Sequence, residues 1–205
     1  MFFYRDFLIK DVYLVPLMNK AEIRKQELTR RKALSLPEVI ALSEKLTLQF
    51  AALNFEGMET IHFFLPIEQN NEPDTFMLIK WLKEHHPGIR IIVPKADFTT
   101  SLMTHHPYSG EEDLQKSLFN ILEPVLDVQY SGKIDMVIVP LLAFDSRGYR
   151  VGYGKGFYDR FLQETQTLKV GLSLFDSVDT IVDIHANDVK LDLCLTPEKT
   201  VYFNS

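Results

Sequence analysis

One uninterrupted apolar run most restricts the fold of this chain. Residues 134–144 read IDMVIVPLLAF, and Asp135 is the only charged residue among them. A parallel strand that helices cover on both faces reads as a continuous apolar run, because neither face meets water. The run therefore predicts a central strand of a parallel sheet with helices on both sides.

Strand-like and helix-like segments alternate along the rest of the chain. Ser35, with Pro37 in the first turn, is typical of a helix start. The expected helices cover residues 19–31, 35–54, 74–88 and 157–166. The expected strands are residues 60–66, 89–94, 134–144 and 169–175, with edge strands at 191–195 and 200–203. Between residues 95 and 130 we expect one or two short strands and a loop. This order predicts an α/β fold, a three-layer sandwich around a mostly parallel Rossmann-like sheet in a single domain.

Composition limits the partners of such a domain. The net charge of -6 over 205 residues argues against a general nucleic-acid binder, although a local group of cations is enough to bind a small anion. No apolar run approaches the about 20 residues that a membrane helix needs, so no membrane partner is expected. Cys194 is the only cysteine, which excludes an internal disulfide, fits a reducing cytoplasm and predicts a packing role. We expect a cytoplasmic monomer.

The first residues differ in character from the domain that follows. Residues 1–17 are aromatic and apolar but carry charges at Arg5, Asp6, Lys10 and Asp11. A signal peptide would place its basic residues before an unbroken apolar core. An extra strand and a disordered extension are the two alternatives. Because the helical pattern begins at Asn19, we favour an appendage over residues 1–17 and a domain over residues 18–205.

A glycine-rich loop follows the apolar run, in the stretch GYRVGYGKGFYDRFL from residue 148 to 162. A P-loop needs Gly-Lys followed by Ser or Thr, but Gly154-Lys155-Gly156 is followed by Phe157. A dinucleotide fingerprint needs Gly-x-Gly-x-x-Gly, whereas Gly152, Gly154 and Gly156 alternate. The loop therefore belongs to neither of the two common phosphate-binding patterns.

Its position and chemistry still predict an anion site. The loop leaves the central strand at its carboxyl end, where ligands bind in parallel sheets. Alternate glycines let backbone amides turn inward around an anion, and the following helix adds its positive end. Arg150 and Lys155 supply full charges, and Asp159 supplies oxygens suited to Mg²⁺. The predicted ligand is a phosphate group with magnesium. The alternative to a binding site is a mobile surface turn in which Tyr153, Phe157 and Tyr158 pack as core.

A longer stretch carries a family resemblance. Residues 139–162, VPLLAFDSRGYRVGYGKGFYDRFL, closely resemble the signature of the 5-formyltetrahydrofolate cyclo-ligases, also called methenyltetrahydrofolate synthetases. The segments NKAEIRKQELTRRKAL, PIEQNNEPDT and NDVKLDLCLTP are similar to further parts of that family, so the resemblance runs from about Met18 to the end. Two residues depart from the pattern. Leu141 replaces a common glycine and could narrow the floor of the site, and Phe157 replaces a frequent tyrosine.

The resemblance implies an activity and a set of site residues. The implied reaction is the ATP- and Mg²⁺-dependent conversion of 5-formyltetrahydrofolate to 5,10-methenyltetrahydrofolate with release of ADP and phosphate, through a phosphorylated formyl group. It places catalytic roles on Lys155, Arg150 and Tyr158, and metal binding on Asp159 and Asp188. The implied ATP-binding residues are Lys20, Arg24, Arg150, Val151, Gly152, Tyr153, Gly154, Lys155, Gly156, Phe157 and Tyr158. The implied folate contacts are Ile67, Glu72 and Tyr153.

Plainer interpretations remain open for several of these residues. Without the resemblance, Lys20 and Arg24 are an ordinary solvated helix face, and Glu72 is a residue on the approach to a helix. Asp145 can fix the turn around Gly148 as well as touch a ligand. Of Asp188 and Asp192, one can simply cap a turn. The paired histidines at 85–86 and 105–106 lack the spacing and the cysteines of a zinc site.

Two other functions remain as alternatives. One is a different phosphate-binding α/β enzyme, such as a sugar-phosphate isomerase or a coenzyme A transferase, which would not need the pair Lys20 and Arg24. The other is a relative that binds folate or nucleotide without turnover.

Overall fold

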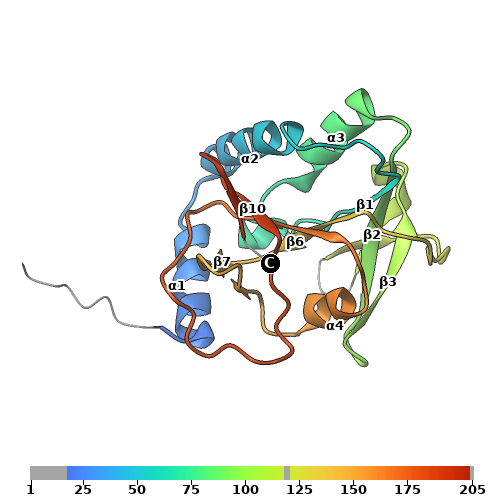
Figure 1. Ribbon diagram of the computed structural model, residues 1–205. Coiled ribbons are helices and arrows are strands. Elements are labelled where there is room, and N and C mark those ends of the chain that lie inside the picture. Colours follow the sequence, from blue (N-terminus) through green and yellow to red (C-terminus); the bar gives the residue numbers. More distant parts are fainter. Residues whose placement is uncertain (1–17, 118–120, 204–205) are drawn as a thin grey trace, which may run out of the picture.

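A seven-stranded sheet runs through the middle of the molecule in the order β11-β10-β9-β6-β1-β2-β3 (Figure 1). The computed structural model describes residues 18–117 and 121–203. The strands are β1 Thr60–His62, β2 Arg90–Asp97, β3 Leu102–Pro107, β6 Met136–Pro140, β9 Leu168–Leu172, β10 Leu193–Leu195 and β11 Thr200–Tyr202. All neighbouring pairs are parallel except the two edge pairs, β2–β3 and β10–β11. The predicted mostly parallel sheet is confirmed.

Helices cover the sheet on both faces (Figure 1). They are α1 Lys20–Lys32, α2 Leu36–Ala51, α3 Thr75–His85 and α4 Phe157–Gln163, with short 3₁₀ turns η1 Glu68–Asn70 and η2 Glu111–Asp113. Capping boxes fix the starts of the first two helices, Asn19 with Glu22 and Ser35 with Glu38. Helices α2 and α3 lie over one face, and α4 lies over the other.

Strand β6 shows why both faces are apolar. Met136 and Ile138 belong to the core that α2 and α3 cover, whereas Val137 and Val139 belong to the core on the α4 side, and all four are fully buried. Each such side chain contributes about 1.5–3 kcal/mol by leaving water. The predicted three-layer α/β sandwich, with this strand buried on both sides, is confirmed.

Three details of the sequence prediction are wrong. The apolar run does not form one strand: β6 ends at Pro140, and β7 Ala143–Phe144 turns away to pair with β8 Arg150–Val151. Between residues 95 and 130, β2 continues to Asp97 and three further strands occur, β3 and the pair β4 Leu114–Lys116 and β5 Leu122–Pro124. Strand β10 is not an edge strand, because β9 and β11 flank it.

The order of the strands opens a crevice between β1 and β6. From β1 the chain moves by way of α3 to β2 on one side, and from β6 it moves to β9 and β10 on the other. Connections that diverge from two adjacent parallel strands leave a gap at their carboxyl ends, which is the usual ligand site of such sheets. The segments that follow β1 and β6 are therefore the walls of the expected site.

No helix among residues 18–117 and 121–203 is long and apolar enough to span a membrane. The appendage predicted for residues 1–17 lies outside the described residues.

Candidate active site

A cavity of about 630 Å³ opens at this crevice. The charged part of its lining comes mainly from the first turns of α1, the stretch after β1, the glycine loop with the start of α4, and the loop that precedes β10. Strands β2 and β3, the region of β5 and the end of β6 complete the wall. The predicted residues that line it are Lys20, Arg24, Ile67, Glu72, Arg150, Gly152, Tyr153, Gly154, Lys155, Gly156, Phe157, Tyr158, Asp159 and Asp188. Val151 is the exception, because its side chain is fully buried against Ile23 and Ala143. The fold thus brings nearly all of the predicted site residues to one cavity.

Helix α1 turns a charged face to the glycine loop. Lys20 and Arg24 are one turn apart, and Arg31 lies two turns beyond Arg24 on the same face. Arg24 Nε donates a hydrogen bond of 2.9 Å to the carbonyl oxygen of Gly152. At Gly154, φ is +87°, and an added Cβ would lie 3.2 Å from Arg24 Nη2. Glycine is required there both for the left-handed backbone and for the approach of the guanidinium.

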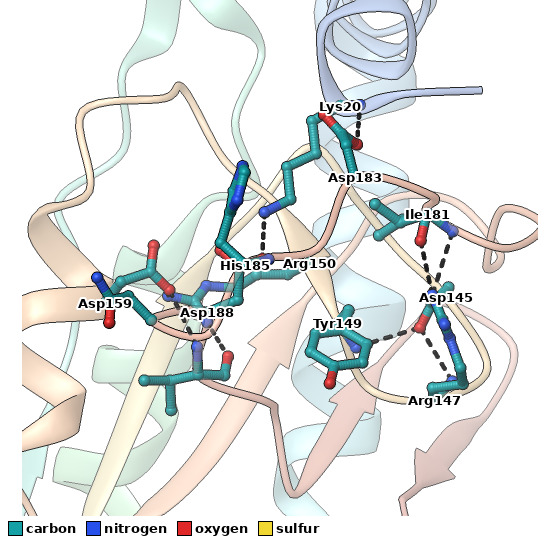
Figure 2. Close-up of polar contacts among 12 residues, drawn as sticks. Lys20, Asp145, Arg147, Tyr149, Arg150, Asp159, Ile181, Asp183, His185 and Asp188 are labelled. Carbon is teal, nitrogen blue, oxygen red and sulfur yellow. Dashed lines mark hydrogen bonds and ion pairs between the residues drawn. The ribbon is translucent and has the colours of Figure 1, made fainter.

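The two predicted metal-binding aspartates each face a cation (Figure 2). Asp159 Oδ1 accepts a hydrogen bond of 2.8 Å from Arg150, and Asp188 Oδ2 accepts one from Lys20 Nζ. The Asp188 carboxylate also accepts the backbone N–H of His185 at 2.7 Å. Burial opposes ionisation of Asp188, but the hydrogen bonds from Lys20 and His185 outweigh it and lower its pKa. The pKa of Arg150 is lowered by burial, which Asp159 opposes.

Each of the two aspartates keeps one carboxylate oxygen that could bind a metal ion. Within the described residues, Asp159 Oδ2 and Asp188 Oδ1 accept no hydrogen bond. Both carboxylates lie near the Arg150 guanidinium, which brings them to the same part of the cavity. No group of three or more His, Cys, Asp or Glu side chains in the described part of the chain is placed to enclose a metal. A site of one or two carboxylates, completed by phosphate oxygens and water, is the type that suits Mg²⁺.

Lys155 provides an uncommitted positive charge. Its side chain is exposed at the cavity wall, and within residues 18–117 and 121–203 no carboxylate lies within 4.0 Å of its ammonium group. Arg24 likewise has no carboxylate at that distance in the described chain, whereas Lys20 and Arg150 are paired with Asp188 and Asp159. Lys155 and Arg24 are thus the cavity cations available to an incoming anion.

Glu72 lies in a buried network at the other end of the cavity. Its Oε1 accepts a hydrogen bond of 2.6 Å from the Tyr153 hydroxyl, and its Oε2 accepts the Ile67 N–H at 2.8 Å. The Arg31 guanidinium lies 3.8 Å from the same carboxylate and donates to the Tyr153 oxygen. Burial raises the pKa of Glu72, and Arg31 opposes that rise. Burial and the neighbouring Glu72 raise the pKa of Tyr153, so its hydroxyl stays protonated and donates.

Tyr158 presents a hydroxyl that has no hydrogen-bond partner within the described residues. The oxygen is buried, and the residue lines the cavity. Burial raises the pKa of Tyr158 well above its usual value. An unpaired buried hydroxyl costs about 1–3 kcal/mol, so this group is a ready donor for a ligand oxygen or nitrogen.

Asp145 lies outside the cavity lining. Its carboxylate accepts the backbone N–H groups of Arg147 and Tyr149 and pairs with the Arg147 guanidinium (Figure 2). It also accepts the Ile181 N–H at 3.2 Å. Of the two interpretations left open, the structural one holds: Asp145 fixes the turn that leads into the glycine loop. Asp192 is structural too, since it accepts the Lys169 N–H at 2.7 Å.

The expectation that Leu141 narrows the site is wrong. Its side chain is 2% exposed and packs in the core on the α4 side of the sheet, near Gly171, where an added Cβ would lie 2.9 Å from Leu141 Cδ2. The missing side chain at Gly171 makes the room. Phe157 does line the cavity and packs edge-on against Phe98, with ring centroids 5.4 Å apart.

Several residues at or next to the site were not predicted, and Arg31, Asp183 and His185 stand out among them because they are polar and contact predicted site residues or line the cavity. Arg31 could have been found from its helical spacing to Arg24. Asp183, whose Oδ1 accepts the Lys20 N–H at 2.7 Å, and His185, which lines the cavity, come from an irregular loop with no sequence pattern. Only the folded chain brings that loop to the start of α1.

His62 and His105 lie together away from this cavity. His62 is fully buried, its ring lies 5.1 Å from that of His105 and 5.3 Å from that of Phe161, and neither of its nitrogens has a partner in the described chain. His105 also lines a second cavity of about 720 Å³ between β3 and α4. That cavity contains none of the predicted charged residues, so the first is the candidate active site.

Comparison with known proteins identifies a family for the chain. Residues 17–197 match the model of the "5-formyltetrahydrofolate cyclo-ligase family". A 5-formyltetrahydrofolate cyclo-ligase of Mycoplasma pneumoniae is 31% identical over 186 residues, covering 88% of this chain and 100% of the relative. One of Escherichia coli is 32% identical over 148 residues, or 68% of this chain and 79% of the relative. The structure of Aquifex aeolicus 5,10-methenyltetrahydrofolate synthetase superimposes with a TM-score of 0.76 at 29% identity, over 92% of this chain and 94% of that one.

Proposed function

The chain belongs to the 5-formyltetrahydrofolate cyclo-ligase family and is an enzyme of that kind, and we propose that it uses Mg²⁺-ATP to convert 5-formyltetrahydrofolate to 5,10-methenyltetrahydrofolate. ADP and phosphate are released, and the formyl oxygen is phosphorylated on the way. The observation that carries the proposal is one cavity that holds two kinds of subsite: uncommitted cations and glycine amides at one end, and a buried carboxylate at the other.

The cationic end is suited to the triphosphate. Arg24 is held against the glycine loop by its bond to Gly152, which leaves its terminal nitrogens for phosphate oxygens. Lys155 adds a charge that no carboxylate of the described chain neutralises. Phosphoryl transfer depends mainly on positioning and on neutralising charge, and these groups supply both.

Asp159 and Asp188 are the residues that would hold Mg²⁺, each through the carboxylate oxygen that accepts no hydrogen bond within the described chain. When bound, the ion would neutralise charge on the transferring phosphate. Lys20 and Arg150 hold the two carboxylates in place and prevent uncompensated repulsion between them in the free protein.

The carboxylate end is suited to the folate. Glu72 is buried and oriented by two hydrogen bonds, so its carboxylate can accept N–H groups of a pteridine ring. Ile67 lies beside it and offers an apolar contact. The hydroxyl of Tyr158 projects from α4 without a partner in the described chain and is available to the reacting part of the substrate.

Two bond exchanges complete the reaction. The formyl oxygen attacks the γ-phosphorus, an oxygen–phosphorus bond forms, and the bond to the β-phosphate breaks, so ADP leaves. N10 then attacks the formyl carbon, a carbon–nitrogen bond forms, and phosphate leaves with the carbon–oxygen bond, while N10 gives up its proton. Arg150, Lys155 and Tyr158 are the proposed catalytic residues, because each lines the cavity and can donate to the oxygens that gain charge.

The test is a turnover assay on the full chain. With Mg²⁺-ATP and 5-formyltetrahydrofolate near neutral pH, we expect the absorbance of the methenyl product to appear and ADP to form in equal amount. Omitting ATP should abolish both signals. A folded protein that makes no product at saturating substrate would refute the proposal, and product without ADP would refute its phosphorylated intermediate.

A further inference from the structure

We propose that Arg31 is a positioning residue for the folate subsite, which holds Tyr153 and the turn before Glu72 in place and keeps the Glu72 carboxylate charged. This inference rests on the proposed function, because it takes the carboxylate end of the cavity to be the folate end. Arg31 does not line the cavity; it acts through the two residues that do.

The guanidinium of Arg31 joins three separate segments. Its Nε donates to the carbonyl oxygen of Asn70 at 2.9 Å, in the turn that leads to Glu72. Its Nη1 donates to the carbonyl oxygen of Leu141 at 3.1 Å, just after β6. Its Nη2 donates to the Tyr153 hydroxyl in the glycine loop. A planar fork with several fixed donors can reach three directions at once, which a lysine cannot do.

The same turn is tied to α1 a second time. The side-chain amide of Asn71 donates to the carbonyl oxygens of Arg31 and Leu34, at 3.0 and 2.9 Å. The φ of Asn71 is 48°, a left-handed conformation in which asparagine is common. The end of α1 therefore sets the path of the backbone that delivers Glu72, and Arg31 contributes the charged part of that connection.

Charge is the second part of the argument. Glu72 is 5% exposed and Arg31 is 3% exposed, so solvent screens their interaction weakly. The titratable groups that face Glu72 are Arg31 from α1, Tyr153 from the glycine loop and Tyr158 from α4. Of these, Arg31 favours the ionised carboxylate by its positive charge, against the effect of burial. Without Arg31, burial would favour the protonated carboxyl, which presents one acceptor oxygen and one donor.

Tyr153 links Arg31 and Glu72 to the glycine loop. Its hydroxyl accepts from Arg31 and donates to Glu72, so it transmits the orientation of the guanidinium to the carboxylate. Because Tyr153 follows Gly152, which Arg24 holds, both substrate ends of the cavity are fixed by one face of α1.

The experiment measures binding of 5-formyltetrahydrofolate without ATP, by calorimetry, as a function of pH. We expect Arg31→Met to weaken binding on the order of tenfold at about pH 7 and to recover part of that loss as the pH is raised and Glu72 ionises. Arg31→Lys should weaken binding at every pH but keep the pH profile of the parent protein, because the charge remains. Tyr153→Phe should weaken binding while leaving Arg31 in place.

Arg30→Met is the matched control. Arg30 is the next residue of the same helix, its guanidinium lies over the ring of Phe175 at 3.7 Å, and it lines no part of the cavity. We expect its folate affinity and pH profile to equal those of the parent protein. Thermal unfolding of each variant shows that the comparison is between folded proteins.

Two results would overturn the inference without touching the proposed function. One is an active parent enzyme whose Arg31→Met variant binds folate normally at about pH 7. The other is a loss of binding in Arg31→Met that no increase in pH restores while Tyr153→Phe binds normally. A parent protein that binds 5-formyltetrahydrofolate but never turns it over would instead refute the proposed function.

Discussion

Arg24 donates a hydrogen bond of 2.9 Å to the carbonyl oxygen of Gly152, a residue 128 positions away in the chain. The bond fixes the first half of α1 against the glycine loop, at the wall of the cavity that carries Lys155. It explains how a loop with neither standard glycine fingerprint can still be held in shape. Helix α1, which is rich in Lys and Arg, holds the loop in place through this hydrogen bond.

Lys155→Ala tests the cationic end of the cavity. We expect ATP binding to weaken by on the order of 1.5–3 kcal/mol, the value of one charge-assisted hydrogen bond. The affinity for 5-formyltetrahydrofolate should stay the same. Calorimetric titration of ATP measures the effect, and Lys45→Ala, which removes an exposed lysine paired with Glu198, is the control. An unchanged ATP affinity would place Lys155 outside the phosphate site.

Asp159→Asn tests the metal ligands. The Mg²⁺ concentration for half-maximal activity should rise on the order of tenfold or more, because one charged oxygen ligand is lost. With Mg²⁺ removed by chelation, the variant should bind ATP at least as well as the parent, since a carboxylate that repels phosphate is gone. Asp176→Asn, at an exposed aspartate paired with Lys199, is the control. An unaltered Mg²⁺ requirement would exclude Asp159 as a ligand.

Leu141→Ala tests the correction made above. Removing a buried leucine side chain costs about 2–5 kcal/mol of unfolding free energy, which urea denaturation measures. The Michaelis constants for both substrates should not change, because the side chain packs beside Gly171 and not in the cavity. Leu48→Ala, at a residue 71% exposed, should leave stability almost unaltered. A changed folate constant in a stable Leu141 variant would contradict the placement.

The buried histidines predict a pH dependence of stability. Burial and His106 lower the pKa of His105 to about 4, and burial and His105 lower that of His62 further below its usual 6.5. The unfolded chain then binds more protons than the folded one between pH about 6.5 and about 4, so stability falls as the pH falls through this window. The unfolding temperature should drop by about 2–4 °C for each kcal/mol lost.

His105→Phe isolates that contribution. It removes one titrating ring from the cluster and should flatten the dependence between pH about 6.5 and about 4. His85→Gln, at an exposed histidine stacked on Trp81, should follow the parent curve. Equal slopes for the parent protein and His105→Phe would show that the cluster does not titrate as described.

Local patterns of the sequence predicted much of the fold. The apolar run at β6 indicated a strand buried on two faces, and the capping residues Asn19 and Ser35 mark true helix starts. The strands between residues 95 and 130 were less predictable, because such short strands depend more on their packing in the folded protein than on local propensity. The split of the apolar run at Pro140 has the same origin: Ala143 pairs with Val151 in a hairpin whose partner strand the sequence does not reveal.

Most of the candidate site could be predicted from the glycine loop and from the family resemblance of three further segments, which include Lys20, Glu72 and Asp188. The glycine loop and its charges follow from spacing and position in the sheet. Arg31 was overlooked although its helical spacing to Arg24 places it on the same face of α1. The loop of Asp183 and His185 was not found, because its role arises only when distant segments converge. Leu141 was misplaced since a sequence shows that a side chain is large but not which way it points; here the absence of a side chain at Gly171 gave it a place in the core.

Helix α1 differs from α2 and α3 in the kind of side chain that it buries. Of its thirteen residues only Ile23, Glu27 and Arg31 are buried, and two of those three carry charge, so substrate binding and helix docking draw on the same side chains. Helices α2 and α3 bury apolar residues such as Leu46 and Leu78 on the opposite face. A substitution on the inner face of α1 is therefore expected to change substrate binding and helix packing together.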